Sequence, residues 1–243
     1  MEINEFKELT EAVFAAHKLK CELTEQMFDI FYKMTERLLS ENEKYNLTAI
    51  RTVGGVIENH IFDSVLPAGG IPEGARVLDV GSGGGFPALP LATVRPDLKI
   101  TALDATEKKV EYIRATAELL GLSNVTAVCG RAEELSSDGS EMREKFDVVI
   151  ARSVASLATL SELCVPFLGV GGKFIAMKSE KAIHEAKEAE NALYLLGCVQ
   201  KCEIIKPYAV DPETDKLFMV TVKRTKTPIK YPRKYAQIKK KPL

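Results

Sequence analysis

A-R-V-L-D-V-G-S-G-G-G-F-P-A-L-P-L-A-T-V-R-P-D-L-K-I-T-A-L-D, residues 75–104, is the stretch that decides the fold of this chain. Its apolar runs and glycines predict a strand, a glycine turn, a helix and a second strand that ends on an acidic residue: 76–80, 81–85, 89–94, 100–103 and Asp104. This order of elements is typical of a nucleoside-binding unit in a doubly wound α/β sheet.

The glycine turn and Asp104 predict an adenosine-like ligand. Glycines such as Gly81 and Gly83 let the backbone come close to a bound molecule. The free N–H groups at the start of the following helix favour an anionic or carboxylate group. Asp104 stands where a doubly wound sheet places the carboxylate that accepts hydrogen bonds from ribose hydroxyls.

Two cofactors compete for this geometry. A dinucleotide-binding turn requires G-x-G-x-x-G, but the sixth position counted from Gly81 is Phe86. The chain instead has D-x-G-x-G-x-G from Asp79 to Gly85, a pattern of S-adenosylmethionine enzymes. A turn that holds no ligand is a further alternative, although four glycines in five residues cost backbone entropy. We therefore predict S-adenosylmethionine as the cofactor, with a dinucleotide as the alternative.

Composition indicates one globular, enzyme-sized unit. The chain has 243 residues, of which 46% are hydrophobic and 28% charged. Its five cysteines are odd in number and lack metal-ligand spacing, so we expect reduced thiols and no metal. The first residues, M-E-I-N-E-F-K-E, contain no long apolar run, so neither a signal peptide nor a membrane span is expected. We expect a cytoplasmic protein.

Charge is distributed unevenly along the chain. Residues 223–243 carry nine Lys or Arg and no acid, while the remainder holds 24 basic and 34 acidic residues. Such asymmetry indicates a nucleic-acid partner, although a basic tail that only neutralises an acidic body is the alternative. Tyr231 and Tyr235 could stack on unpaired bases. The candidate RNA-binding residues are Lys230, Arg233, Lys234, Lys239, Lys240 and Lys241.

A helical extension precedes a series of alternating strands and helices. Thr24 is a plausible N-cap for an amphipathic helix whose apolar stripe, Met27 to Leu38, should face a core. Further strands are expected at 125–129, 146–151, 173–178 and 217–223, and the last of them is expected at a sheet edge. Strands that alternate with helices predict a parallel sheet with ligands at the carboxyl ends of its strands. We divide the chain into 1–70, a helical extension packed on the core, 71–224, the catalytic domain, and 225–243, a basic tail.

Additional candidate site residues follow the third and fourth strands. Gly130-Arg131-Ala132-Glu133 and Arg152-Ser153 should face the same crevice as Gly81. A residue after the third strand can reach an adenine ring, and Phe86 could add an apolar wall. The structural alternatives are that Glu133 caps the next helix and that Arg152 pairs with an acidic residue on the surface.

Several strings resemble one bacterial family, ribosomal RNA small subunit methyltransferase G, also called glucose-inhibited division protein B. They are K-Y-N-L-T-A-I (44–50), H-I-F-D-S (60–64), D-V-G-S-G-G-G-F-P-A-L-P-L-A (79–92), G-R-A-E-E (130–134), F-D-V-V-I-A-R-S-V-A (146–155) and T-P-I-K-Y-P-R-K (227–234). The resemblance spans nearly the whole chain in the family's order. Glycine turns occur in very many methyltransferases, whereas the first two strings and the Y-P-R tail are more specific.

The resemblance implies a Rossmann-like class I S-adenosylmethionine-dependent methyltransferase with a mostly parallel twisted sheet and an N-terminal helical extension. It implies methylation of N7 of one guanine, guanine 527 in the standard numbering, in 16S ribosomal RNA or the small subunit, by a protein expected to be a monomer. The carried-over cofactor residues are Gly81, Phe86, Asp104, Ala105, Thr106, Ala132, Glu133 and Arg152. The tail departs from the family pattern, because Tyr235-Ala236-Gln237-Ile238 replaces an expected glycine-containing turn.

Motifs of other base methyltransferases are absent after the fourth strand. Ala151-Arg152-Ser153 stands where enzymes that methylate exocyclic amines have Asp-Pro-Pro-Tyr or Asn-Pro-Pro-Tyr, and no Pro-Cys pair is present there. Guanine N7 has an available lone pair, so catalysis would consist chiefly of positioning. The candidates for the guanine pocket are Asn46, His60, Asp63 and Ser64. The alternative for His60 and Asp63 is that they cap or pair on a helix surface.

Two other functions remain open from the sequence. The chain could methylate another RNA site or a small molecule. It could also be a regulatory RNA-binding protein that senses S-adenosylmethionine without turning it over.

Overall fold

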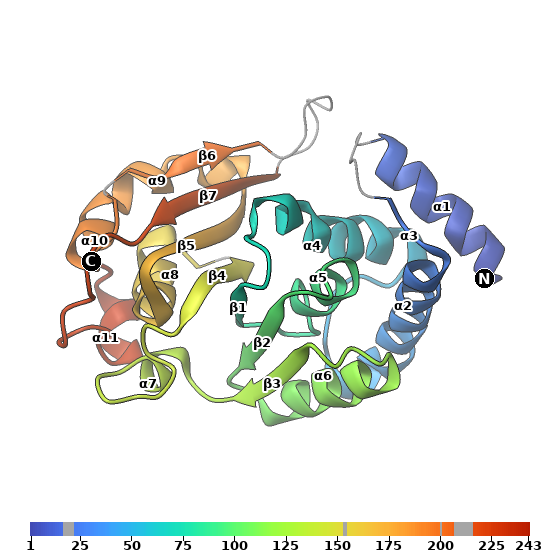
Figure 1. Cartoon of the computed structure of the whole chain (residues 1–243), viewed down its shortest axis with the longest axis horizontal. Coiled ribbons are helices and arrows are strands. Elements are labelled where there is room, and N and C mark those ends of the chain that lie inside the picture. The colour runs from blue at the N-terminus through green and yellow to red at the C-terminus, as the bar shows by residue number, and fades with distance from the viewer. Residues whose placement is uncertain (17–21, 153–154, 200, 207–215) are drawn as a thin grey trace.

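Seven strands form one central sheet in the computed structural model, which describes residues 1–16, 22–152, 155–199, 201–206 and 216–243 (Figure 1). The strands are β1 (Arg76–Val80), β2 (Lys99–Asp104), β3 (Val125–Cys129), β4 (Phe146–Arg152), β5 (Leu168–Ser179), β6 (Glu203–Ile205) and β7 (Lys216–Val222). Their order is β3-β2-β1-β4-β5-β7-β6. The first five strands are parallel, whereas β7 and β6 are antiparallel to their neighbours.

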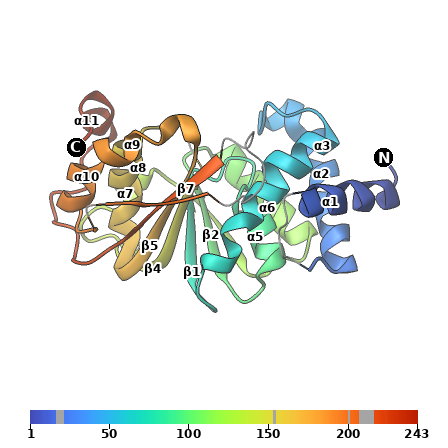
Figure 2. The same cartoon turned by 90° about the horizontal axis from the view of Figure 1, so that it is seen from above.

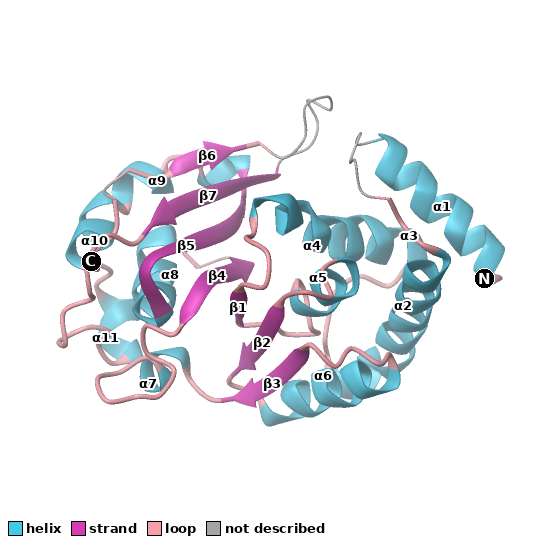
Figure 3. Cartoon of the chain, in the orientation of Figure 1, coloured by secondary structure: helices cyan, strands magenta, loops and turns pink. Residues whose placement is uncertain are grey.

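Helices cover both faces of the sheet, as Figures 1 and 2 show from two directions and Figure 3 by colour. One face carries α1 (Ile3–Ala16), α2 (Glu25–Tyr45), α3 (Val53–Val56), α4 (Asp63–Val65), α5 (Ala88–Val94) and α6 (Glu107–Leu119). The other carries α7 (Ala132–Leu135), α8 (Leu157–Cys164), α9 (Glu185–Glu188), α10 (Glu190–Leu195) and α11 (Tyr235–Lys240). Four short helical turns are η1 (Ile57–Phe62), η2 (Leu66–Gly70), η3 (Val165–Phe167) and η4 (Glu180–Ala182).

The N-terminal extension shares one hydrophobic core with the sheet. Phe6 of α1 and Phe31 of α2 are fully buried in the same cluster as Val77 of β1 and Ile100 of β2. The extension therefore packs on the sheet face that α5 and α6 also cover. The division at residues 70 and 224 stays a prediction.

The predicted start of α2 is confirmed. Thr24 has extended backbone angles, and its side-chain oxygen accepts a hydrogen bond from the Met27 N–H at 3.3 Å. This bond satisfies one of the N–H groups that a helix leaves free at its first turn. Met34 and Leu38 are fully buried, so the apolar stripe faces the core as expected.

The expected edge position of the last strand is wrong. β7 lies between β5 and β6, and it pairs with β5 from Lys173 to Ser179. The short strand β6 occupies the edge, and its three residues give too little periodicity to predict a strand. The apolar residues from Ile57 to Val65 form the expected helical run, although 57–62 have π-helical hydrogen bonding.

The C-terminal strap, defined as residues 223–243, is folded against the body. The Lys223 side chain is fully buried, and its ammonium lies 2.7 Å from Glu144 Oε1 and donates to the Leu168 carbonyl at 2.7 Å. The Arg143 guanidinium donates at 2.9 Å to the carbonyls of Thr227 and Tyr231. These contacts hold the first half of the strap to the segment just before β4 and to the start of β5.

Two residues of the strap differ from their expected roles. Tyr231 is only 6% exposed, which corrects the expectation that it stacks on unpaired bases. Arg233, predicted to bind RNA, makes a two-pronged ion pair with the fully buried carboxylate of Glu162, with N–O distances of 2.8 and 2.6 Å. Counting charges could not reveal this pairing, because Glu162 lies 71 residues earlier in the chain.

Within the described ranges, every helix is too short or too polar to cross a lipid bilayer.

We predict that Arg233→Ala destabilises the protein by about 3–5 kcal/mol, because the Glu162 carboxylate would remain buried without its partner. The measurement is the free energy of unfolding in urea at neutral pH. Lys234→Ala is the matched control, since Lys234 is exposed and its loss should change stability by less than about 0.5 kcal/mol. Equal effects of the two substitutions would show that the ion pair does not anchor the strap.

Candidate functional site

The glycine turn between β1 and α5 is held by hydrogen bonds to β2. The backbone N–H groups of Gly81 and Ser82 both donate to the Leu103 carbonyl, at 2.8 and 3.0 Å. Gly81 has a φ of +78°, a backbone conformation that residues other than glycine adopt only at a cost in free energy. A Cβ built at Gly81 would meet no atom within 4 Å, so open space adjoins the turn.

Two carboxylates flank the turn, as the sequence predicted. Asp104 accepts hydrogen bonds from the N–H groups of Gly83, at 3.0 Å, and Thr106, at 2.9 Å. Asp79 is 1% exposed, and its Oδ2 accepts from the Ala88 N–H at 3.2 Å. Asp79 Oδ1 is buried and has no partner among the described residues. Burial raises the pKa of Asp79 from 3.8 to about 7.

These features fit a cationic nucleoside cofactor. The unpartnered oxygen of Asp79 is a buried acceptor, which is costly unless a donor or a cation satisfies it. Open space lies beside Gly81, and Asp104 follows β2 at the place where ribose hydroxyls bind in doubly wound folds. The residues present thus suit a ligand with a ribose and a positive charge better than a dinucleotide, whose pyrophosphate adds negative charge.

Three side chains from distant parts of the chain meet beside the turn. The His60 ring stacks on the Phe86 ring, with centroids 4.5 Å apart and planes 17° apart. The Arg152 guanidinium, at the end of β4, lies 5.7 Å from the Phe86 ring centroid. It donates to the Asn59 carbonyl at 2.8 Å and lies 3.0 Å from His60 Nδ1. The alternative from the sequence, that Arg152 pairs with an acidic residue on the surface, is therefore wrong.

The hydrogen bonds of His60 fix its protonation. A guanidinium can only donate, so Nδ1 must accept from Arg152 and Nε2 must carry the proton. Nε2 lies 2.7 Å from Thr48 Oγ1, which serves as its acceptor. Burial, followed by the charge of Arg152, lowers the pKa of His60 from 6.5 to about 3. His60 is thus a neutral group with both ring nitrogens engaged, and it is not suited to act as a general base.

Asn42 holds the loop that supplies Thr48. It is 3% exposed, its Oδ1 accepts from the N–H groups of Leu47 and Thr48, and its Nδ2 donates to the Thr48 carbonyl at 2.9 Å. Asn46, just before this loop, adopts a left-handed conformation with a φ of +51° and ends α2. The string K-Y-N-L-T-A-I therefore forms a fixed wall that reaches Arg152 through Thr48 and His60.

A cavity of about 680 Å³ opens beside Arg152, at the carboxyl ends of β4 and β5 and the start of β7. Its charged lining residues are Asp63, Arg152, Lys178, Lys181, Glu185 and Lys216. Leu66, Met177 and Phe218 contribute apolar surface. A flat polar molecule that enters this cavity would meet an apolar wall and charged groups at its edges.

The cavity's two carboxylates are paired. Asp63 Oδ1 lies 2.6 Å from Lys216 Nζ, and Glu185 Oε2 lies 2.9 Å from Lys178 Nζ. Glu185 also accepts from the Leu157 N–H at 2.6 Å, at the start of α8. These contacts fix the orientation of both carboxylates.

The remaining predicted residues have three different outcomes. Ala105 and Thr106 follow Asp104, and Ala132 and Glu133 open α7 just after β3, so all four lie at the expected edge. No side-chain hydrogen bond caps α7, so the structure gives no support to Glu133 as a helix cap. Ser64 is fully buried and donates to the His60 carbonyl, which gives no support to its placement in a guanine pocket. Ser153 lies outside the described residues.

Sequence reasoning did not identify Asn42, Thr48, Lys178, Glu185 or Lys216. Lys178 is next to last in β5, so the rule that ligands bind at the carboxyl ends of parallel strands could have identified it. Lys216 opens an antiparallel strand, and Asn42 acts through the backbone of a loop, so neither has a comparable signal. Among the described residues, no cluster of His, Cys, Asp and Glu could hold a metal ion.

Comparison of the sequence with known families and proteins gives a consistent result. The family model described as rRNA small subunit methyltransferase G, GidB, matches residues 26–206. Ribosomal RNA small subunit methyltransferase G of Streptococcus gordonii is 40% identical over 225 residues, which cover 91% of this chain and 94% of that protein. The same-named protein of Streptococcus pyogenes serotype M12 is 41% identical over 223 residues, covering 90% and 91%.

Solved structures agree with the fold. The SAM-dependent O-methyltransferase of Thermotoga maritima has a TM-score of 0.53 at 20% identity, covering 79% of this chain and 72% of that chain. M. jannaschii TYW2, solved in complex with AdoMet, has a TM-score of 0.51 at 20% identity, covering 69% and 77%. At this identity the likeness concerns the fold alone. It confirms the predicted Rossmann-like class I S-adenosylmethionine-dependent methyltransferase fold.

We predict that Gly81→Ala weakens S-adenosylmethionine binding at least tenfold, because the added methyl group would occupy the open space beside the turn. Isothermal titration calorimetry measures the change. Gly74→Ala is the matched control, since Gly74 also has a positive φ, +67°, and open surroundings but precedes β1 at the opposite end of the strand. Both substitutions should cost about 1 kcal/mol of stability. Equal cofactor affinities of the two variants would contradict the placement of the cofactor beside the glycine turn.

A second prediction separates the two hydrogen bonds of His60. His60→Asn keeps an acceptor near the position of Nδ1, whereas His60→Gln places its amide nearer Thr48 and loses the acceptor for Arg152. We expect kcat/KM for RNA to fall about tenfold or more in His60→Gln and less in His60→Asn, because bonds to charged groups contribute about 1.5–3 kcal/mol.

The pH dependence of these variants provides the control. Because the pKa of His60 lies near 3, the ratio of wild-type to His60→Asn activity should stay constant between pH 6 and 8. A ratio that shrinks below pH 6.5 would indicate that His60 acts as a base and would contradict the account.

Proposed function

The chain belongs to the ribosomal RNA small subunit methyltransferase G family, and from this premise we propose that it methylates N7 of guanine 527, in the standard numbering, of 16S ribosomal RNA. Family membership establishes S-adenosylmethionine-dependent methylation of ribosomal RNA. The target atom and nucleotide are the proposal. The substrate would be 16S RNA or the small subunit, which would place the activity in the cytoplasm.

One observation supports N7 as the acceptor: no described residue that lines the cavity is poised to remove a proton. The neighbouring His60 is neutral with both nitrogens engaged, and Asp63 and Glu185 are paired with lysines. An exocyclic amine or a hydroxyl must lose a proton during methylation, whereas guanine N7 presents a free lone pair. The cavity therefore suits an acceptor that requires no general base.

The two carboxylates of the cavity are the groups that would favour this reaction. S-adenosylmethionine supplies an electrophilic methyl group when bound, and methylation at N7 leaves the guanine with a positive charge. Fixed carboxylates near that charge stabilise it in surroundings partly shielded from water. Asp63 and Glu185 both line the cavity, and Lys216 and Lys178 orient them while offsetting part of their charge.

The proposed cofactor residues follow from the glycine turn and the adjacent strand ends. Gly81 and Gly83 would allow close approach of the backbone, while Asp104, Ala105 and Thr106 would contact the ribose and adenine. Ala132 and Glu133 would lie along the adenine, as the resemblance implies. Phe86 closes the glycine turn and contacts Arg152, which lines the cavity, so these two residues would stand where the cofactor meets the guanine.

The guanine pocket and the RNA-binding surface are proposed with changes from the sequence prediction. Asp63 lines the cavity directly, and His60 acts through Arg152, while Asn46 shapes the loop beside them. Lys230, Lys234, Lys239, Lys240 and Lys241 are exposed and remain proposed phosphate contacts. Arg233 is not retained, because its guanidinium binds Glu162.

The experiment that tests this function is transfer of a tritiated methyl group from S-adenosylmethionine to small ribosomal subunits from cells that lack the endogenous activity. We expect label on a single guanine, and chain cleavage at that guanine after borohydride and aniline treatment, which is characteristic of N7 methylation. This chemistry is expected because none of the described lining residues is poised to act as a base.

The other outcomes distinguish the alternatives. Label at another nucleotide would keep the methyltransferase but reject the target, and label only on small molecules would reject the RNA substrate. Cofactor binding with no transfer to any RNA would favour a sensor.

A further inference from the structure

Two of the strap's nine basic residues are internal anchors. Lys223 is fully buried beside Glu144, and Arg233 binds the buried Glu162 carboxylate. The other seven are exposed and form no ion pair with any residue in the described ranges: Arg224, Lys226, Lys230, Lys234, Lys239, Lys240 and Lys241. The anchors fix the positions of these cations on the surface.

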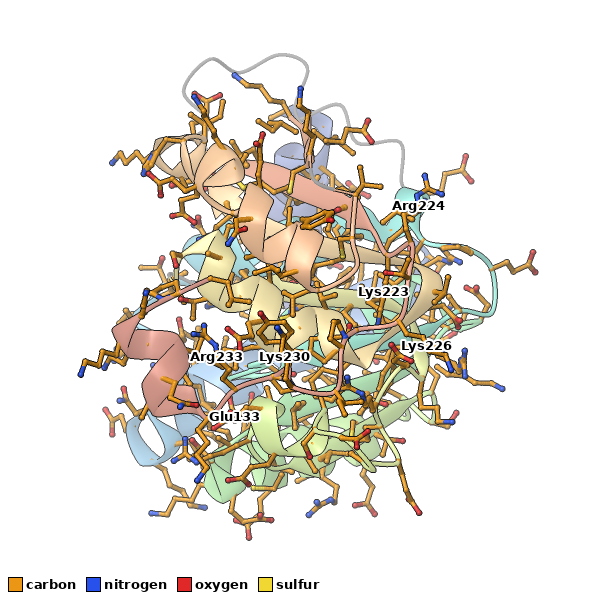
Figure 4. The ribbon with its side chains drawn as sticks, turned by 90° about the vertical axis from the view of Figure 1, so that its left-hand side faces the viewer. Glu133, Lys223, Arg224, Lys226, Lys230 and Arg233 are labelled. Atoms are coloured by element: carbon orange, nitrogen blue, oxygen red, sulfur yellow. The ribbon has the colours of Figure 1, made fainter. Side chains whose placement is uncertain are left out.

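The strap runs from the amino ends of the parallel strands to α7. Val222 pairs with Lys173, which pairs with Val148 near the start of β4, so the strap begins at the amino ends of the parallel strands. Its residues 232–235 face α7, which follows the carboxyl end of β3. Figure 4 shows Arg224 and Lys226 on the right of the strap and Arg233 and Glu133 on the left. Only the second half of the strap therefore lies near the carboxyl end of β3, on the side of the sheet where the proposed cofactor site lies.

A groove of about 640 Å³ separates α7 from this second half. Its lining residues are Arg131, Glu133, Glu134, Ser137, Pro232, Arg233, Lys234 and Tyr235. Arg131 and Lys234 are exposed cations, and Tyr235 is 42% exposed. A cation on each wall together with an accessible aromatic ring is the combination that binds unpaired nucleotides, through phosphate contacts and stacking.

The groove's acidic residues limit how a nucleotide can lie. Glu133 and Glu134 belong to the α7 wall, where they disfavour phosphate and can accept hydrogen bonds from base amino groups. Arg233 adds little positive charge, because Glu162 neutralises it. A base between Tyr235 and α7, with phosphates directed toward Arg131 and Lys234, satisfies all of these groups.

We propose that the groove between α7 and the strap binds an unpaired RNA nucleotide near the target guanine, with its base stacked on Tyr235 and its phosphates at Arg131 and Lys234. This inference rests on the proposed ribosomal RNA substrate. It makes the strap a second, specific contact with the RNA. It also places that contact beside Glu133, at the adenine end of the proposed cofactor site.

The test measures binding of a fluorescein-labelled RNA hairpin, with the target guanine in its unpaired loop, by fluorescence anisotropy across a salt series. Tyr235→Ala should raise Kd about fivefold or more with no change in salt slope, whereas Tyr235→Phe should stay within about twofold of wild type. Lys234→Ala should weaken binding and reduce the slope of log K against log salt by about 0.7.

Lys226→Ala is the matched control, because Lys226 is an equally exposed cation at the other end of the strap. It should leave Kd nearly unchanged. Tyr235 and Lys234 are exposed, so their variants should melt at the wild-type temperature, and each melting curve is recorded.

Each outcome decides the proposal. Unchanged binding of Tyr235→Ala, or equal losses for Tyr235→Ala and Tyr235→Phe, would overturn stacking in the groove. Equal losses for Lys226→Ala and Lys234→Ala would show a diffuse basic surface instead of a groove. Methyl transfer by the wild-type protein to small subunits is measured separately: its absence would reject the proposed function, whereas its presence with unaffected groove variants would reject the groove alone.

Discussion

The contact of Arg152 with His60 and Phe86 is the interaction on which the site depends. Arg152 ends β4, Phe86 closes the glycine turn, and His60 belongs to the helical extension. One half-buried guanidinium thus joins the sheet, the proposed cofactor turn and the extension. Because a guanidinium stays protonated and donates in a fixed plane, it also sets the tautomer of His60. The cavity begins at this junction, so its shape depends on all three parts.

The helical extension forms one wall of the candidate site. Asn42 holds the loop after α2, Thr48 meets His60, and Asp63 meets Lys216 from the other end of the chain. These contacts are polar and largely shielded from water, so leaving any partner unpaired would be costly. The apolar stripe of α2 supplies the burial that keeps the wall in place. The glycine turn is shared with many methyltransferases, whereas this wall is built from the strings that resemble the family specifically.

Local signals in the sequence predicted much of the fold and the cofactor turn. Strand β1, the turn, α5 and Asp104 lie within 30 consecutive residues, and their spacing alone predicts their arrangement. Pairings between distant residues could not be predicted in this way. The Arg152 bond to His60 spans 92 residues and the Arg233 pair with Glu162 spans 71. A charge pattern therefore assigned Arg233 to RNA, although its guanidinium binds the buried Glu162 carboxylate.

The central claim is that the enzyme positions guanine N7 without a general base. The most direct test is the single-turnover rate of methyl transfer to small subunits from pH 6 to 9, with saturating S-adenosylmethionine so that titration of Asp79 does not limit cofactor binding. The account predicts a rate that is independent of pH over this range, because His60 stays neutral and N7 carries no proton to remove. A rate that rises tenfold per pH unit up to a plateau would reveal a catalytic base and contradict the account.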